Sequence, residues 1–293
     1  MLIASLTSSY NRKHLTLKSI GQLYNDFYND DIDVKHYLVD DCSSDGTPEI
    51  VKKCFSDIKI INTSGNLYWS RSMSFGWEQI RKEISPDFLF VYNDDTNFKP
   101  KCISKLLETY NEQKSSYGDS IVVVGALVDP IEKYPTYGGR SRNKIKAFTL
   151  SSRILPIKNK IQLAYTLNFN AALIPVKILN DIGFISPYFL HGGGDWEFGY
   201  RCQKYSIPII QSPGFVGTCS FNSNIGSSRE LNISLFERYK RLLSIKEQPF
   251  LPRLNFVVRY GGFLFLLQLF LPDLQIFLFH FYVLFFRKNK INK

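Results

Sequence analysis

The chain has 293 residues, of which 44% are hydrophobic and 21% are charged, so it can bury a sizeable core and wholesale disorder is excluded. Ordinary counts of 18 Gly and 13 Pro exclude collagen-like and proline-rich classes. The five cysteines are odd in number and contain no C-x-x-C pair. This favours reduced thiols in the cytosol over a disulfide framework or a zinc site.

The net charge of +10 lies mainly near the C-terminus. Residues 226–293 hold 11 Lys and Arg against 4 Asp and Glu, which gives this segment a charge of +7. Such a basic, aromatic segment indicates either nucleic acid or an anionic membrane surface as a partner. The first residues form an apolar run with no basic region before it, so we expect no secretory signal and a cytoplasmic site of action.

Strand-like and helix-like segments alternate in the first half of the chain. Strands are predicted at Leu2–Thr7, His36–Val39, Ile58–Asn62 and Phe88–Tyr92, and helices at Lys13–Tyr24, Thr47–Phe55 and Ser70–Ile84. The second half predicts strands at Ile121–Leu127 and Ala171–Pro175, a basic, loop-like stretch at Lys133–Lys160, and helices at Asp195–Tyr205 and Leu231–Lys246. This alternation is typical of an α/β fold with a mostly parallel, Rossmann-like sheet and helices on both faces. The predicted domains are 1–225 and a basic, apolar helical extension at 226–293.

Polar clusters follow the predicted strands at the point where each strand ends. They are Ser8-Ser9, Asp40-Asp41, Ser64-Gly65-Asn66 and Asn93-Asp94-Asp95. Ligands of parallel α/β sheets bind at the carboxyl ends of the strands. The convergence of these clusters on one edge of the sheet therefore predicts a binding site there.

The segment VDDCSSDGT (39–47) places two adjacent acids at the end of a strand. Asp40 and Asp41 repel each other, so they are tolerated best where a cation or a hydrogen-bond donor meets them. One interpretation is a turn in which Asp45 caps the helix that begins at Thr47. The other is that the carboxylates recognise the base and ribose of a nucleotide.

The segment YNDDTNF (92–98) is a second acidic cluster, and it follows a strongly apolar strand. Mg²⁺ and Mn²⁺ take oxygen ligands, often one or two carboxylates together with substrate phosphates. Asp94 and Asp95 suit that role, and a solvated turn is the alternative.

The segment HGGGDWEFGYRC (191–202) is the third cluster. Three successive glycines let the backbone approach a ligand closely. Asp195 then stands near a helix N-terminus, with Glu197 and Arg201 on the following turns. A helix cap at Asp195 and an i,i+4 ion pair of Glu197 with Arg201 form the alternative, which leaves the glycines unexplained. The absence of G-x-G-x-x-G, P-loop and G-x-S-x-G motifs argues against dinucleotide enzymes, P-loop enzymes and α/β-hydrolases.

Taken in order, five segments resemble family 2 glycosyltransferases of the GT-A fold. They are SSYNR (8–12), VDDCSSDGT (39–47), INTSGNLYWSRSMSFGW (61–77), YNDDT (92–96) and GGDWEFGYRC (193–202). The resemblance covers roughly residues 1–220 and is nearest to bacterial enzymes that build O-antigen, capsule and other cell-surface polysaccharides. It implies a nucleotide-diphosphate sugar as donor, a glycan acceptor, and Mg²⁺ or Mn²⁺ as cofactor.

The resemblance also implies roles for individual residues. The positions that match donor-binding residues are Thr7, Ser9, Asp40, Asp41, Asn66, Arg71 and Asp94. Asp94 and Asp95 match the D-x-D region that holds the metal against the diphosphate, and Asp95 is expected to make the direct contact because Asn93 stands at the first position. Asp195 matches the catalytic base. The acceptor side is implied for Trp196, Glu197 and Arg201.

The residue types support the same chemistry directly. In a single displacement, a carboxylate takes the proton of an acceptor hydroxyl as that oxygen attacks the anomeric carbon, and a cation stabilises the leaving diphosphate. No nucleophilic carboxylate is required, so inversion of configuration is predicted. The alternatives are a nucleotidyltransferase that makes sugar nucleotides, a catalytically silent sugar-nucleotide-binding homologue, and a nucleic-acid-binding protein.

The segment Gly261–Phe286 is almost wholly apolar, with Asp273 as its only acid and no Lys or Arg. Pro272 and Asp273 are predicted to divide it into halves that are too short to cross a bilayer. We therefore expect two apolar segments attached peripherally to the inner face of the cytoplasmic membrane, close to a lipid-linked acceptor. A transmembrane helix and a soluble homo-oligomer interface are the alternatives.

Overall fold

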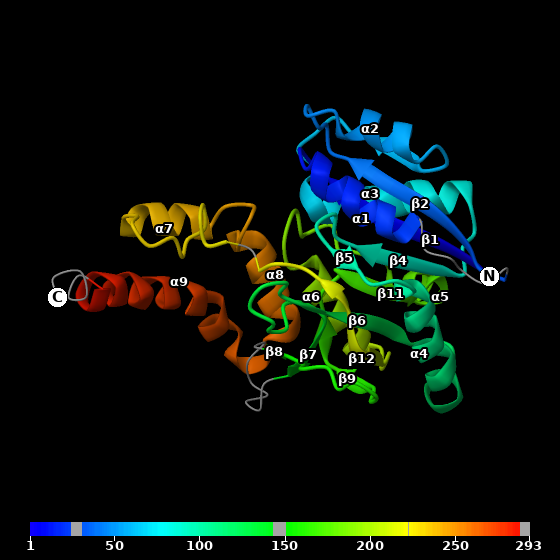
Figure 1. Cartoon of the computed structure of the whole chain (residues 1–293). Helices are drawn as coiled ribbons and strands as arrows, with labels where there is room; N and C mark the ends of the chain where they lie inside the picture. The colour runs from blue at the N-terminus through cyan, green and yellow to red at the C-terminus, as the bar shows by residue number, and fades with distance from the viewer. Residues whose placement is uncertain (25–30, 143–150, 222, 288–293) are drawn as a thin grey trace. The chain divides into compact units, whose positions relative to one another are not determined.

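The computed structural model describes residues 1–24, 31–142, 151–221 and 223–287, and Figure 1 draws the whole chain. The chain divides into two compact units. The N-terminal unit comprises Met1–Arg142 and Ser151–Ser220, and the C-terminal unit begins at Phe221. The division falls slightly before the predicted boundary at residues 225 and 226.

A nine-stranded sheet forms the centre of the N-terminal unit (Figure 1). Its strands are β1 (Leu2–Ser9), β2 (Asp33–Asp40), β3 (Lys59–Asn62), β4 (Phe88–Tyr92), β5 (Asn97–Phe98), β6 (Val122–Val128), β9 (Gln162–Ala164), β11 (Ala171–Pro175) and β12 (Ile209–Thr218). The order is β3-β2-β1-β4-β11-β6-β12-β5, and β9 pairs with β12. The pairings of β1 with β2 and β4, of β2 with β3 and of β6 with β12 are parallel, whereas β11, β5 and β9 are antiparallel to their neighbours. The prediction of a mostly parallel sheet is confirmed.

Helices cover both faces of this sheet, as predicted. They are α1 (Lys13–Tyr24), α2 (Thr47–Cys54), α3 (Tyr68–Glu83), α4 (Cys102–Tyr117), α5 (Val176–Ile182) and α6 (Gly194–Lys204). Buried side chains of α3, α5 and α6 pack in one core together with one set of strand residues. Buried side chains of α1, α2 and α4 pack in two other cores, with strand residues that alternate along the chain with the first set. In β4, Leu89 and Val91 enter the first core and Phe90 enters the second. Because both faces are covered, the strand is apolar at every position.

The basic stretch 133–160, predicted to be a loop, contains two strands among its described residues. β7 (Gly139–Arg142) pairs with β8 (Ser151–Arg153) and with β10 (Thr166–Leu167) in a separate three-stranded sheet. The prediction was wrong because these strands are short and polar, so no apolar alternation marks them. Residues 143–150 of the stretch lie outside the described residues.

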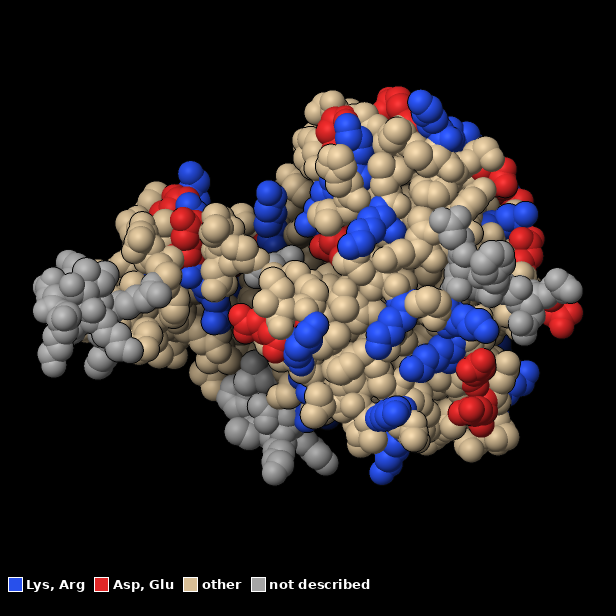
Figure 2. Space-filling view, in the orientation of Figure 1, with Lys and Arg blue, Asp and Glu red and all other residues tan. Residues whose placement is uncertain are grey.

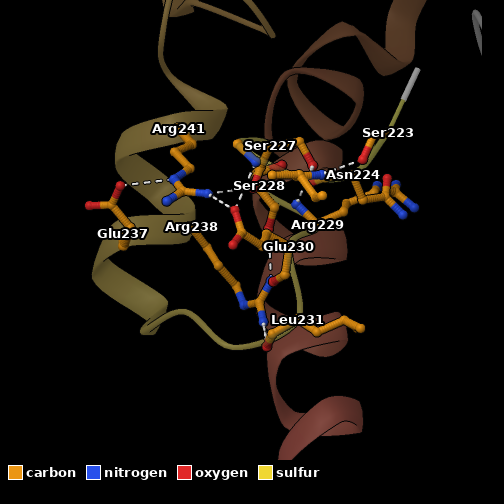
Figure 3. Close-up of polar contacts among 12 residues, drawn as sticks. Ser223, Asn224, Ser227, Ser228, Arg229, Glu230, Leu231, Glu237, Arg238 and Arg241 are labelled. Atoms are coloured by element: carbon orange, nitrogen blue, oxygen red, sulfur yellow. Dashed lines mark hydrogen bonds and ion pairs between the residues drawn. The ribbon is translucent and has the colours of Figure 1, made fainter.

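The C-terminal unit contains α7 (Leu235–Leu242), α8 (Phe250–Tyr260) and α9 (Phe265–Tyr282). The basic helix is shorter than predicted, because the Ser234 hydroxyl caps it by accepting from the Glu237 N–H. The backbone carbonyls of the turn before α7 accept hydrogen bonds from a side chain of that helix. Arg238 is fully buried and donates to the carbonyls of Ser228, Glu230 and Leu231 over 2.6–2.8 Å (Figure 3). This guanidinium therefore fixes the turn that leads into α7.

The predicted interruption of the apolar segment at Pro272 is wrong, because α9 runs through that residue without a break. Proline removes one helical hydrogen bond, yet the helix continues past it. Asp273 forms an ion pair with Arg253 of α8 at 2.9 Å, and its carbonyl accepts from the Tyr239 hydroxyl at 3.0 Å. The acid that was expected to be costly in an apolar segment is therefore paired within the C-terminal unit.

Candidate active site

Side chains at the ends of β1 and β4 are joined by a run of hydrogen bonds. The Ser9 hydroxyl lies 2.7 Å from that of Thr16 in α1, and Thr16 Oγ1 donates to Asp94 Oδ2 over 3.3 Å. The Asp41 N–H donates to the Ser9 carbonyl over 3.0 Å, which brings the end of β2 to the same edge. The end of β1, which carries the Ser9 hydroxyl, therefore lies close to both acidic clusters, the one after β2 and the one after β4.

One guanidinium nitrogen bridges the two carboxylates that follow β4. Arg12 Nη1 lies 2.8 Å from Asp94 Oδ1 and 3.2 Å from Asp95 Oδ2. Burial raises the pKa of Asp94, and the charge of Arg12 opposes that rise. Asp95 is more open, and its Oδ1 accepts from Cys219 Sγ at 3.5 Å. The two carboxylates therefore converge on one cation, as they would have to do to share a metal ion.

Asp41 is engaged by the chain itself through both of its oxygens. Oδ1 accepts from Thr63 Oγ1 at 2.7 Å and from the Leu67 N–H at 3.1 Å, and Oδ2 accepts from the Tyr68 N–H at 3.0 Å. Because Leu67 immediately precedes α3 and Tyr68 is its first residue, the Asp41 carboxylate holds the start of that helix in place.

One carboxylate oxygen of Asp40 is able to accept a further hydrogen bond. Its Oδ2 accepts from the Ser43 N–H at 2.8 Å, but the buried Oδ1 has no partner among the described residues. The same holds for the hydroxyl oxygen of Thr7 on the neighbouring strand. Buried polar atoms are almost always paired in folded proteins, so these two oxygens are candidates for contact with a ligand.

The start of α3 is tied to the glycine-rich loop. The N–H groups of Ser70 and Arg71 donate to the Leu190 carbonyl at 3.1 and 3.4 Å, and the Ser70 hydroxyl donates to the His191 carbonyl at 2.5 Å. The side chain of Arg71 is exposed, and Asn66 is exposed in a left-handed backbone conformation with φ of 66°. The structure thus ties the first turn of α3, which carries the predicted donor-binding residue Arg71, to the loop that precedes Asp195.

The three glycines of the loop have different reasons to be there. Gly193 has a φ of 89°, which strongly favours glycine. At Gly194 an added Cβ would lie 2.6 Å from Ile185 Cγ2 and 3.0 Å from Ser70 Oγ, so the close packing of α6 on α3 requires its absence. Gly192 faces open space. Backbone geometry and packing therefore explain two of the glycines, and only the third leaves room for a ligand.

Asp195 lies in the first turn of α6, where two donors hold its carboxylate. The Trp196 N–H donates to Oδ1 at 2.8 Å, and Asn168 Nδ2 donates to Oδ2 at 3.0 Å. Burial raises the pKa of Asp195, while the two hydrogen bonds and the charge of Arg140 oppose that rise. A raised pKa makes a carboxylate a stronger base than one in water, which suits it to accept a proton from a hydroxyl.

Two residues predicted for the acceptor side, Glu197 and Arg201, pair with each other, and Glu197 lies in the protein interior. Glu197 is fully buried and forms an ion pair with Arg201 at 3.1 Å. Arg201 also donates to the carbonyls of Ile182 and Phe184. A buried carboxylate needs such a counter-charge, so this pair fastens α6 to the turn after α5. Trp196 is partly exposed, as an acceptor contact would need to be.

Several side chains at the site carried no role in the sequence prediction. Arg12 stands in a recognised segment, but its pairing with Asp94 and Asp95 depends on tertiary contact. Asn168 and Arg140 meet α6 from a distant part of the chain, and no local pattern marks them. Asn168 follows β10, a two-residue strand that the sequence did not predict, so no sequence signal pointed to it.

Comparison with known proteins adds an independent line of evidence. A sequence model described as "Glycosyl transferase family 2" matches residues 6–171. Residues 1–349 of TarS from S. aureus have a similar structure, with a TM-score of 0.52, 15% identity, and coverage of 92% of this chain and 72% of that one. The structure of the same TarS segment in complex with UDP-GlcNAc gives a TM-score of 0.53 at 15% identity, with coverage of 92% and 73%.

GalNAc-T7, crystallised with UDP, GalNAc and Mn²⁺, is similar with a TM-score of 0.58, 14% identity, and coverage of 75% of this chain and 42% of that one. The chain also covers 44% of a longer TarS structure, so it spans less than half of these two larger proteins. At these identities the likeness shows a shared fold, which is the GT-A fold of glycosyltransferases. No curated protein sequence matches the chain.

Proposed function

The chain belongs to glycosyl transferase family 2, and on that premise we propose that it transfers a sugar from a nucleotide-diphosphate sugar to a hydroxyl of a glycan acceptor with inversion of configuration. The observation that carries the proposal is the setting of Asp195. Its carboxylate is partly buried, held by two donors, and placed after a loop that is tied to the donor side of the site through Ser70.

The proposed reaction is a single displacement. Asp195 accepts the proton of the acceptor hydroxyl, the oxygen forms a bond to the anomeric carbon, and the bond from that carbon to the diphosphate oxygen breaks. Glu197 is the nearest acid in sequence, and its burial and its pairing with Arg201 argue against a role as nucleophile. Attack by the acceptor itself, from the face opposite the leaving group, inverts the anomeric centre.

The donor is proposed to bind at the ends of β1, β2 and β4. The unpartnered oxygen of Asp40 is available to accept from the nucleoside, and Ser9 and Thr7 lie on the adjacent strand. Asp41 contributes indirectly by positioning the start of α3. Arg71 and Asn66 on that segment are proposed to contact the diphosphate, and their exposure supports this role.

Asp94 and Asp95 are proposed to hold Mg²⁺ or Mn²⁺. Their carboxylates already converge on the Arg12 cation, so their geometry fits a shared positive ion. In the described part of the chain, no group of three or more His, Cys, Asp or Glu side chains is arranged to hold a metal. The remaining ligands would then come from the donor diphosphate and water. When bound, the metal would stabilise negative charge on the leaving group.

A direct test incubates the purified full chain with a panel of nucleotide-diphosphate sugars and measures release of the nucleoside diphosphate. One donor is expected to be consumed. When an acceptor is added, NMR of the glycosylated product should show the anomeric configuration opposite to that of the donor. Retention would contradict the single displacement. Release of pyrophosphate from a nucleoside triphosphate and a sugar phosphate would indicate a nucleotidyltransferase, and binding of a donor without turnover would indicate a silent homologue.

The C-terminal unit is proposed to attach the enzyme to the inner face of the cytoplasmic membrane, where a lipid-linked glycan of a cell-surface polysaccharide would be the acceptor. Residues 262–285 form one helical segment that is long and apolar enough to cross a membrane. Large apolar side chains along it are exposed, including Phe263, Phe270 and Leu274. Such a surface is uncommon on a protein that meets only water.

Charge supports the same proposal. The four acids of residues 226–293 are all engaged: Glu230 and Glu237 bind Arg241, Glu247 binds Ser228, and Asp273 binds Arg253. Arg229, Lys240 and Lys246 are exposed, and further basic residues end the sequence. This unit can therefore present net positive charge to anionic headgroups.

Replacing Phe263 and Phe270 together by serine is expected to lower binding to anionic vesicles at least about tenfold, because each buried phenyl group contributes roughly 1.5–3 kcal/mol. Co-flotation of the full chain with vesicles of phosphatidylglycerol and phosphatidylethanolamine measures the effect. The matched control is Ile131→Ser with Leu155→Ser, since these side chains are 84% and 64% exposed against 86% and 56% for the two phenylalanines. If wild type and both variants stay unbound, the helix serves as an oligomer or packing surface.

A further inference from the structure

The stretch from Lys133 to Lys160 is strongly basic, and the proposed function does not yet use it. It contains no Asp or Glu, and its basic residues are Lys133, Arg140, Arg142, Lys144, Lys146, Arg153, Lys158 and Lys160. Figure 2 shows that basic side chains also gather over the part of the N-terminal unit where Figure 1 places α4 and β9. Positive charge is therefore not confined to the C-terminal segment.

Three arginines of this stretch share one face of the small sheet. Arg140 of β7 lies directly opposite Arg153 of β8 in the antiparallel register. Arg142 is two residues beyond Arg140, so its side chain points to the same face. Like charges opposite each other destabilise a sheet. The pKa of Arg140 is lowered by burial and by the charge of Arg153. A sheet that keeps such a pair gains stability when an anion binds between the charges.

This arginine face adjoins the candidate base. The Arg140 guanidinium lies 4.6 Å from the centre of the Trp196 ring, next to Asp195 in the chain. Arg142 lies 5.0 Å from the Tyr165 ring, which packs at 5.1 Å against Tyr200 of α6. The small sheet and the helix that carries Asp195 are thus in contact through aromatic side chains.

The same part of the chain fixes Asp195 itself. Asn168, just after β10, donates to the Asp195 carboxylate, and Thr166 of β10 donates to the Trp196 carbonyl at 3.0 Å. Arg140 is held by Ser151, which accepts from Nε and Nη2 at 2.8 Å each. The guanidinium is therefore oriented before any ligand arrives, which lowers the entropic cost of binding.

We propose that Arg140, Arg142 and Arg153 form an anion-binding face that holds a phosphate or carboxylate of an acidic acceptor beside Asp195. Arginine recognises both groups through paired N–H donors. The proposal rests on the proposed function, because it assigns the chemical class of the acceptor of that reaction. The donor diphosphate is assigned elsewhere, at the strand ends near Arg12 and Arg71.

The test measures binding of oligosaccharide probes to the full chain by calorimetry at low and high salt. The probes are a glycerol phosphate oligomer, an oligogalacturonate and a neutral maltooligosaccharide. The acidic probes are expected to bind at least about tenfold more tightly than the neutral one, with affinity falling as salt rises. Tighter binding of the first probe assigns a phosphate-bearing acceptor, and tighter binding of the second assigns a sugar acid.

Arg142→Gln and Arg153→Gln are each expected to weaken binding of the acidic probe about tenfold. Both side chains are exposed, so these variants are expected to fold, and circular dichroism checks this. Lys133→Gln is the matched control, because it removes one charge from the same stretch outside the face and should bind as wild type does. Equal binding of neutral and acidic probes, or arginine variants that match the control, overturns the proposal.

Donor binding and turnover separate this proposal from the proposed function. The arginine variants are expected to bind the nucleoside diphosphate of the preferred donor as wild type does. A wild-type chain that binds acidic probes through these arginines but consumes no nucleotide sugar would refute the transferase and leave the anion-binding face standing. Turnover of a donor with no preference for acidic acceptors would refute the face alone.

Discussion

Asp195→Asn is expected to lower turnover by roughly 100-fold or more while nucleoside diphosphate binding stays close to that of wild type. The substitution keeps the size of the side chain and its bond from the Trp196 N–H, but removes its ability to accept a proton. Asn168 can rotate its amide to meet the new group, since its Oδ1 has no partner among the described residues. The fold should therefore be preserved, and the loss should appear in kcat.

The pH profile gives a second readout of the same role. The base acts when it is deprotonated, so activity should rise as pH rises through the pKa of Asp195. Asn168 donates to the charged carboxylate and so opposes the rise in pKa that burial causes. Asn168→Leu removes that bond, raises the pKa further, and is expected to move the acidic limb of the kcat profile to higher pH.

The control for both variants is Asp181→Asn, which neutralises an exposed acid on α5. It should match wild type in turnover and in pH profile. A near-normal kcat for Asp195→Asn would assign proton removal to another group. An unmoved acidic limb in Asn168→Leu would show that the limb reports a different titration.

Most strands and helices of the first hundred residues were predictable from the sequence because the strands are apolar and the helices have an apolar face, whereas α4 and β12 were not predicted. β4 and β11 were predicted with the bounds that the structure shows, and so was α1. β7 and β8 were missed because a short polar strand has no periodic signal. The continuation of α9 through Pro272 was missed for another reason. Local rules place a break at a proline beside an acid, and the pairing of that acid, Asp273, with Arg253 of another helix is a contact that no local rule contains.

The candidate site shows a similar limit. The rule that ligands bind at strand ends predicted ligand contacts for Asp40, Asp41, Asp94 and Asp95 alike. The rule cannot distinguish Asp40 from Asp41, because the two look alike in the sequence. In the structure both carboxylate oxygens of Asp41 accept hydrogen bonds from the chain at or near the start of α3. The rule also could not say that Glu197 is buried. Position along the chain locates a cluster, whereas hydrogen-bond partners decide which of its members is available to a ligand.

Asp95→Asn is expected to reduce the affinity for Mn²⁺ at least about tenfold, and Arg12→Gln is expected to increase it by a similar factor. Both effects follow from the shared position of Arg12 Nη1 between Asp94 and Asp95. A hydrogen bond between charged groups contributes about 1.5–3 kcal/mol, and a metal that takes the same oxygens must displace it. A change of 1.4 kcal/mol is tenfold in affinity.

The measurement is calorimetric or paramagnetic-resonance titration of the full chain with Mn²⁺, with and without the nucleoside diphosphate of the preferred donor. Lys18→Gln, an exposed charge change on α1, is the control for Arg12→Gln and should not alter the affinity. Chelation of divalent cations should abolish turnover of the donor by wild type, and added Mn²⁺ should restore it.

The opposite signs of the two variants make the prediction specific. A general effect of charge on Mn²⁺ binding would also appear in Lys18→Gln, whereas direct competition requires that only Arg12→Gln strengthens Mn²⁺ binding. With the diphosphate bound, the advantage of Arg12→Gln should shrink, because the released guanidinium of wild type can then pair with phosphate oxygens. Unchanged Mn²⁺ affinity in both variants, together with full turnover in excess chelator, would leave Arg12 and Arg71 as the cations that neutralise the leaving group.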